Sequence, residues 1–121
     1  MTEDSPPPFI VFRTPRASRT PYDRALELVG QVHGIVQLST SRFYLEDRLD
    51  RAATGLVFEL GRLASSTQKW KTYRRAHEHA ADVATVLDIF VHQKAAPAAD
   101  LEKARGLVRE LLGELDPLTR G

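Results

Sequence analysis

The segment from Leu45 to Leu63, LEDRLDRAATGLVFELGRL, constrains the fold more than any other part of the chain. Its apolar residues recur every three or four positions, so a helix places them in one continuous stripe. The stripe consists of Leu45, Leu49, Ala52, Leu56, Leu60 and Leu63. Such a stripe has to be buried against partner helices. The segment therefore predicts a helix over about 44–63 that belongs to a helical bundle.

Three further segments show the same helical spacing, and no segment alternates convincingly as a strand would. Thr20 and Pro21 mark the start of the first one, because a hydroxyl caps free amides and proline suits the first helical position. We expect these helices over about 21–38, 67–94 and 98–115, joined by short connections. Four helices of this kind pack most simply as an antiparallel up-down-up-down four-helix bundle, which is an all-α fold.

The spacing also predicts the side chains that face the core. In the first helix these are Ala25, Leu26, Val29, Val32, Val36 and Tyr22. In the third helix they are Trp70, Tyr73, Ala76, Ala80, Val83, Leu87 and Phe90. In the fourth helix they are Leu101, Ala104, Val108, Leu111, Leu115 and Leu118.

Two further patterns concern helix ends and close helix contacts. Ser65 and Gln68 stand at the spacing of a capping box at the start of the third helix. Four glycines lie inside predicted helices, where glycine lowers helix propensity, and we interpret each as a place where another helix comes close. These glycines are Gly30, Gly34, Gly55 and Gly61.

Length, cysteine content and charge limit the class of protein. The 121 residues suit one domain that can bury a core without metal or disulfide support. The chain has no cysteine, which excludes disulfides, thiolate metal sites and cysteine nucleophiles and fits a reducing cytoplasm. The formal net charge is +1, so any basic binding surface has to be local.

The N-terminal sequence, MTEDSPPPFIVFRTP, does not fit a secretory signal, because it opens with acidic residues and prolines instead of a basic start. The apolar run FIVF is far too short to cross a bilayer, and no later run is long enough. We therefore expect a soluble cytoplasmic protein with no membrane partner.

Residues 1–20 are predicted to form an extended or partly disordered arm ahead of the bundle at 21–118. Five of the seven prolines lie in the first 21 residues, and proline disfavours helix there. Within the arm, Phe9, Ile10, Val11 and Phe12 are unusually apolar for a solvated tail. One interpretation is that they pack on their own bundle or stay disordered. The other is that they contact a neighbouring subunit, as exposed apolar clusters do.

Several sequence blocks resemble one protein family. They are Tyr22-x-x-Ala25-Leu26-x-Leu28-Val29, then Leu45-x-Asp47-Arg48-Leu49-x-Arg51-Ala52-Ala53, then Tyr73-x-x-Ala76 with Ala80 and Asp82. Together they resemble the four-helix bundle proteins encoded by intervening sequences of bacterial 23S ribosomal RNA genes. The resemblance spans roughly residues 22–115. Its most specific part is RLDRAA, which is similar to the Gln-Leu-Arg-Arg-Ala-Ala run common in that family.

The resemblance implies an assembly and a partner but no enzyme. Members of the family are similar in fold to the accessory protein of diversity-generating retroelements, a barrel-shaped pentamer of bundles that binds nucleic acid and a reverse transcriptase. A homo-oligomer, plausibly a pentamer, is therefore implied, with RNA, DNA or a protein such as a reverse transcriptase as candidate partners. The family offers no catalytic residues and no cofactor.

The chain departs from the family at two places. Where the second helix usually ends with Asn-Ile-Ala-Glu-Gly, this chain has Glu59-Leu60-Gly61-Arg62-Leu63, so we expect the helix to continue further. Where the third helix usually has Gly-Ser, this chain has Glu78-His79. The accessory proteins are also strongly basic, and this chain is nearly neutral.

The start of the third helix carries the densest basic cluster, at Lys69, Lys71, Arg74 and Arg75. Basic side chains with aromatic neighbours can hold phosphates and stack bases. Helical geometry, however, places Trp70 and Tyr73 on the core stripe and most of the basic residues on an outward face. A solvated basic face is thus the alternative to a nucleic-acid site.

His77-Glu78-His79 suggests a metal site, but its pattern is incomplete. It is not the zinc-protease motif H-E-x-x-H, and the two histidines point to different sides of a helix. The best same-face pairs, such as His79 with Asp82, give two ligands where zinc needs three or four. The block therefore predicts surface or interface polar residues rather than a metal site, and a metal assembled between helices or subunits is the alternative. The chain shows neither a phosphate-binding glycine loop nor a nucleophile turn.

These patterns lead to three hypotheses for the function. The first is a non-enzymatic, homo-oligomeric accessory or scaffold protein that contacts RNA or DNA through the basic start of the third helix. The second is a protein-interaction module that recruits a partner through the bundle surface and the arm, without nucleic acid. The third and most distant is a metal-dependent bundle enzyme.

Overall fold

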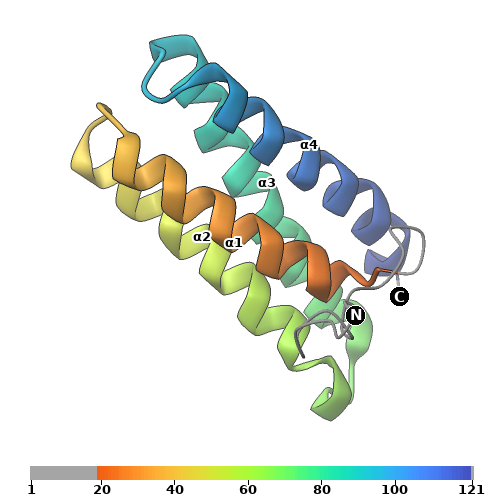
Figure 1. The fold of residues 1–121 in the computed structure, drawn as a ribbon. Helices are drawn as coiled ribbons and strands as arrows, with labels where there is room; N and C mark the ends of the chain where they lie inside the picture. Colours follow the sequence, from red (N-terminus) through yellow and green to blue (C-terminus); the bar gives the residue numbers. More distant parts are fainter. Residues whose placement is uncertain (1–18, 121) are drawn as a thin grey trace, which may run out of the picture.

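A computed structural model describes residues 19–120 as four antiparallel helices packed side by side (Figure 1), and the all-α four-helix bundle is confirmed. Their bounds are α1 Pro21–Leu38, α2 Phe43–Gly61, α3 Lys69–Gln93 and α4 Ala98–Leu115, with short 3₁₀ turns η3 Leu63–Ser65 and η4 Asp116–Thr119. Helices α1 and α4 begin and end where the sequence predicts. The arm predicted over 1–20 lies almost wholly outside the described residues.

The buried face of α1 differs from the predicted one. Ala25 and Val32 are buried as expected, but Leu26 and Tyr22 are exposed, and Leu28 and Ile35 occupy the core instead. The prediction was wrong because α1 carries apolar residues around much of its circumference, so two overlapping stripes are possible. Val29 and Val36 lie half-buried beside the core.

The start of α3 also differs from the prediction. The expected capping box of Ser65 and Gln68 is absent among the described residues, since Gln68 is the N-cap and makes no side-chain capping bond. The helix begins at Lys69 and ends at Gln93, and its C-cap Lys94 adopts a left-handed conformation typical of helix ends. Near its start Thr72 is buried, while the predicted core residues Trp70 and Tyr73 are half-buried.

Helix α2 keeps the predicted buried stripe but stops earlier than expected. Leu49, Leu56 and Leu60 are buried, and Leu63 lies half-buried beside them. The predicted continuation beyond Gly61 is wrong, because the chain turns there into η3. In α4 the predicted stripe is buried up to Leu115, whereas Leu118 lies in η4 and is exposed.

The four glycines have different surroundings. A Cβ built on Gly55 would lie 2.7 Å from Cε1 of His79 on α3, so Gly55 marks a close helix contact as predicted. A Cβ on Gly61 would meet only Tyr22, at an ordinary 3.7 Å. The prediction for Gly30 and Gly34 was wrong, since a Cβ there would meet nothing within 4 Å.

At the end away from the termini, the two connections are tied together. The amide of Thr40 donates a 2.8 Å hydrogen bond to the carbonyl of Ala95, and the amide of Ala95 donates one of 2.9 Å to the carbonyl of Phe90. Phe90 and Ala95 are buried in the core. This end is therefore closed by apolar packing and backbone hydrogen bonds.

None of the helices in the described part of the chain has the length and apolar character needed to cross a membrane.

Candidate nucleic-acid interface and neighbouring sites

The basic cluster at the start of α3 divides into two structural and two surface residues. Lys69 Nζ donates to the carbonyls of Leu63 and Ser66, at 2.9 and 3.2 Å, and so ties η3 to the helix start. Arg75 Nε donates to Glu59 Oε1 at 3.1 Å. Because both cations serve the fold, they contribute less to an external surface than the sequence suggests.

Lys71 and Arg74 form the remaining basic surface, together with the half-buried indole of Trp70. Lys71 Nζ lies 5.6 Å and the Arg74 guanidinium 5.0 Å from the centroid of the Trp70 ring. Such cation–π contacts orient both cations on the ring. Among residues 19–120 neither side chain has a carboxylate partner within ion-pair distance. We name Trp70, Lys71 and Arg74 the α3 basic surface.

A groove of about 400 Å³ runs between α2 and α3, near the middle of the bundle. Its charges largely cancel, since Arg51 pairs with Asp47 at 2.9 Å and Arg48 lies 3.5 Å from Asp82. Its lining residues are Tyr44, Asp47, Arg48, Arg51, Ala52, His79 and Asp82. The groove thus offers a mixed surface with no excess of either charge.

The His77-Glu78-His79 block is dispersed over the helix surface. His79 packs against Gly55 of α2, while His77 Nε2 lies 3.8 Å from Asp116 Oδ1. In the described range no three histidine, aspartate or glutamate side chains come together as a metal site would require.

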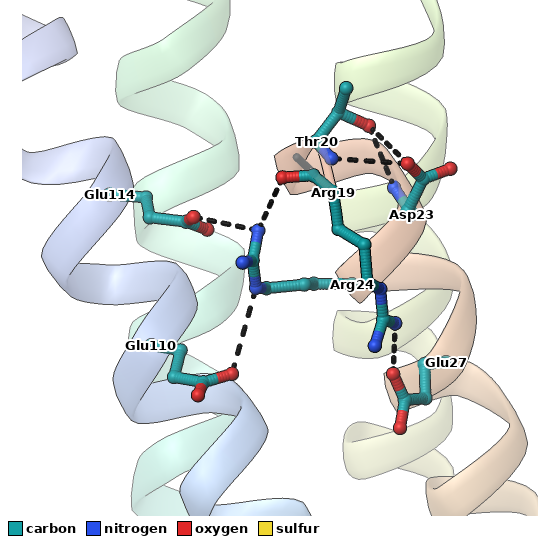
Figure 2. Close-up of polar contacts among 7 residues, drawn as sticks. All are labelled: Arg19, Thr20, Asp23, Arg24, Glu27, Glu110 and Glu114. Carbon is teal, nitrogen blue, oxygen red and sulfur yellow. Dashed lines mark hydrogen bonds and ion pairs between the residues drawn. The ribbon is translucent and has the colours of Figure 1, made fainter. Parts of the chain in front are cut away.

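Arg24 forms a buried charge cluster between α1 and α4 (Figure 2) that sequence reasoning missed. Its residue exposure is 8%, and its Nη1 donates to Glu114 Oε2 and to the carbonyl of Arg19, each at 2.7 Å. Its Nε lies 3.6 Å from Glu110 Oε1. The signal in the sequence is that Arg24 stands one turn before Leu28, on the buried stripe.

The first turn of α1 is held by a capping box beside this cluster (Figure 2). The Asp23 amide donates to Thr20 Oγ1 at 3.1 Å, and the Thr20 amide donates to Asp23 Oδ2 at 3.1 Å. The hydrogen bonds from the Thr20 backbone and hydroxyl lower the pKa of Asp23 below its usual 3.8, with smaller contributions from Arg19 and Arg24. Arg19, which precedes the helix, forms an ion pair with Glu27 in the second turn of α1.

Exposed apolar side chains are concentrated on one half of the bundle. Of the seven large exposed apolar residues in the described chain, six lie on α1 and α2. They are Tyr22, Leu26, Leu38, Phe43, Tyr44 and Phe58. Helical periodicity did not predict the exposure of these residues, because only the packed structure shows which apolar stripe of α1 or α2 faces solvent.

Comparison with known proteins supports the fold and nothing finer. By sequence, the chain matches no protein-family model and no curated protein. By structure, it is similar to a protein of unknown function from the S23 ribosomal protein family of Bacteroides thetaiotaomicron, with a TM-score of 0.76 and 11% sequence identity. The match covers 84% of this chain and 100% of the other. The chain therefore shares a four-helix fold with that protein.

Proposed function

We propose that this protein is a non-enzymatic accessory or scaffold bundle that binds single-stranded RNA or DNA through the α3 basic surface. The observation that carries the proposal is the pair of cations, Lys71 and Arg74, held over the half-buried ring of Trp70 without carboxylate partners among the described residues. Cations beside an aromatic ring suit a nucleic-acid backbone and its bases. The resemblance to the rRNA intervening-sequence family, together with the shared fold, supports the same class of partner.

Binding to a generic oligonucleotide tests this proposal, with Trp70 as a reporter because it is the sole tryptophan. We expect Trp70 fluorescence to change on binding and the affinity to fall with salt. Changing Lys71→Glu with Arg74→Glu should abolish binding. Replacing each by glutamine instead should lower the log–log salt slope by about 1.4, at roughly 0.7 for each lost single-strand contact.

The matched control is Lys103→Glu with Arg109→Glu, which makes the same charge change at two exposed positions of α4. This control should leave binding nearly unchanged if the α3 basic surface is the site. Equal loss in both double variants would show that only net charge matters. No binding by the unchanged protein at low salt would reject the proposal.

We further propose that the protein works as a homo-oligomer, and the resemblance implies five copies. Several copies of the α3 basic surface around one rim would concentrate positive potential that a nearly neutral monomer lacks. Light scattering tests this, since a pentamer would have about five times the 13.6 kDa of one chain. A monomeric mass at micromolar concentration would reject it.

A second candidate function is recruitment of a protein partner, such as a reverse transcriptase, without nucleic-acid contact. The exposed aromatic pair at the start of α2 favours it, with Phe43 81% and Tyr44 62% exposed. Exposed aromatic residues of this kind are typical of interaction surfaces. Changing Phe43→Ser with Tyr44→Ser should then weaken binding to that partner, whereas Lys71→Glu with Arg74→Glu should leave it unchanged.

A further inference from the structure

The groove between α2 and α3, which we name the α2–α3 groove, holds paired charges that still face solvent. Arg48 and Asp82 meet across it, with Nη2 of the arginine 3.5 Å from Oδ1 of the aspartate. This distance exceeds the roughly 2.7–3.2 Å of an N–H···O hydrogen bond, and the two side chains are 63% and 48% exposed. An exposed ion pair of this kind contributes little to stability. A ligand can therefore bind both groups at little cost to the fold.

The walls of the α2–α3 groove suit a flat aromatic ligand. Tyr44 lines one end and is 62% exposed, so a second ring can stack on it. Ala52 contributes only a methyl group, and His79 lies against Gly55, where a Cβ would stand 2.7 Å from the imidazole. The volume of about 400 Å³ lies within the range of small-molecule sites. The groove thus offers an aromatic face beside one guanidinium and one carboxylate.

Among the nucleic-acid bases, guanine matches these two charged groups best. Its O6 and N7 together accept two hydrogen bonds from one guanidinium. On the adjoining edge, its N1–H and 2-amino groups donate two hydrogen bonds to one carboxylate. Adenine, cytosine and uracil each carry a single donor group on that edge, so none of them can occupy both carboxylate oxygens. An arginine and an aspartate held side by side therefore favour guanine.

We propose that the α2–α3 groove binds a guanine base, with Arg48 on O6 and N7, Asp82 on N1–H and the amino group, and Tyr44 stacked on the ring. The base is carried by a free guanine nucleotide or by a single strand, and the strand source rests on the proposed function. Lys71 of the α3 basic surface and Asp82 stand about three turns apart on one row of α3, or about 16 Å along its axis. Stacked bases rise about 3.4 Å each, so a strand of about five nucleotides spans that distance.

Guanosine 5′-monophosphate tests the groove without a strand. Added to ¹⁵N-labelled protein, it should shift the amide signals of residues 44–52 and 79–82. Adenosine 5′-monophosphate should bind at least about fivefold more weakly, which is the lower end for one bidentate contact. Inosine 5′-monophosphate lacks the amino group that donates to Asp82, and 7-deazaguanosine 5′-monophosphate lacks the N7 that accepts from Arg48, so both should bind more weakly as well. Equal affinities for the guanine and adenine nucleotides would overturn the proposal.

Asp82→Asn is the variant that tests the proposed recognition, and Asp88→Asn is its matched control. Both acids lie on α3 and pair with an arginine, but Asp88 pairs with Arg105 of α4, at 3.2 Å. The readout is the ratio of the affinities for the guanine and adenine nucleotides, because a lost negative charge strengthens the binding of both phosphates alike. Asp82→Asn should bring this ratio close to one, and Asp88→Asn should leave it unchanged. Equal loss of preference in both variants would overturn the proposal.

A hexamer of uridines with one central guanosine distinguishes the two sources of the base. If a strand supplies it, this hexamer should bind more tightly than the all-uridine hexamer and than guanosine 5′-monophosphate. Lys71→Glu with Arg74→Glu should remove the advantage over the mononucleotide. Binding of the mononucleotide without any hexamer binding would support the groove as a free-nucleotide site and reject the proposed function. Salt-dependent hexamer binding with no preference for guanosine would overturn the groove proposal and leave the proposed function in place.

Discussion

Two helix contacts at the end of the bundle that holds the termini use charge in opposite ways. Between α1 and α4, the buried group is a cation, Arg24, and its partners Glu110 and Glu114 are partly exposed carboxylates. Between α2 and α3, the buried group is an anion, Glu59, and its partner Arg75 is a half-exposed cation. Both contacts join antiparallel neighbours in one bundle (Figure 1).

The difference between the contacts reflects how the chain connects them. Helices α2 and α3 are joined by the short connection 62–68, so their pairing costs little loop entropy. Helices α1 and α4 are the first and last of the bundle and have no connection of their own. The Arg24 guanidinium contacts two carboxylates that lie one helical turn apart on α4. These contacts fix the position of α1 along α4, because no loop connects the two helices.

Among the variants that test this comparison, Arg24→Met should lower the free energy of unfolding most. Methionine keeps an apolar stem but loses the charge-assisted bonds, and we expect a loss of about 1.5–3 kcal/mol in the free energy of unfolding. It also leaves Glu110 and Glu114 as like charges at i,i+4 spacing. Urea unfolding followed by circular dichroism measures the loss.

The control for Arg24→Met adds Glu114→Gln in the same chain. This second change removes the like charge, so part of the lost stability should return. An unchanged urea midpoint for Arg24→Met alone would contradict a stabilising role for the cluster.

The α2–α3 contact should respond unequally to removal of its two partners. Changing Arg75→Met leaves the carboxylate of Glu59 buried without its closest cation, and we expect a loss of about 1–3 kcal/mol. Changing Glu59→Gln leaves Arg75, whose side chain already reaches water, and should cost only about 0.5–1.5 kcal/mol. Thermal unfolding of both single variants and of the double variant measures the two losses of stability and the coupling between Glu59 and Arg75. The interpretation fails if Glu59→Gln is the more damaging change.

The sequence predicts the bundle well because helical periodicity and turn signals are local. In α2 the leucines Leu49, Leu56 and Leu60 recur along one stripe, and this stripe is the buried one. In α1 the apolar residues form two overlapping stripes, and the choice of Leu28 over Leu26 depends on packing against the other helices. Local patterns thus give the helix, while its rotation needs the rest of the fold.

The candidate site is only partly predictable for a related reason. Lys69 and Arg75 belong to the basic cluster in sequence, but their partners Leu63, Ser66 and Glu59 come from α2 and the connection after it. A charge on a helix is usually on its surface, so periodicity gives little reason to bury Glu59. Its position three residues after Leu56, on the buried stripe, is the available signal.

Two glycines test how closely α2 and α3 pack, because Gly55 lies at their contact and Gly30 lies on an open surface of α1. Changing Gly55→Ala places a methyl group 2.7 Å from the His79 ring, and overpacking of about 1–3 kcal/mol should exceed the roughly 1 kcal/mol gained in helix propensity. Changing Gly30→Ala meets nothing and should stabilise α1 by at most about 1 kcal/mol. Melting temperatures of the two variants should therefore move in opposite directions. Stabilisation by both would show that α2 and α3 separate easily at Gly55.

The smallest expected effect is the pH dependence of the stability that the capping box gives to the start of α1. Because the folded pKa of Asp23 is lowered, the folded state binds fewer protons than the unfolded state near that pKa. The stability from the capping box is therefore present above the usual value of 3.8 and is lost as pH falls through the folded pKa. Asp23→Asn should be less stable than the unchanged protein at neutral pH, and the difference should shrink in acid.

Asp100→Asn is the matched control for this titration. Asp100 also lies in the first turn of a helix, but the N-cap of α4 is Pro97, which makes no side-chain capping bond. Unfolding free energies measured at neutral pH and in acid should therefore change less with pH for this variant than for Asp23→Asn. The same pH dependence in both would mean that the charge at a helix start, rather than the hydrogen bonds from Thr20, stabilises the first turn of α1.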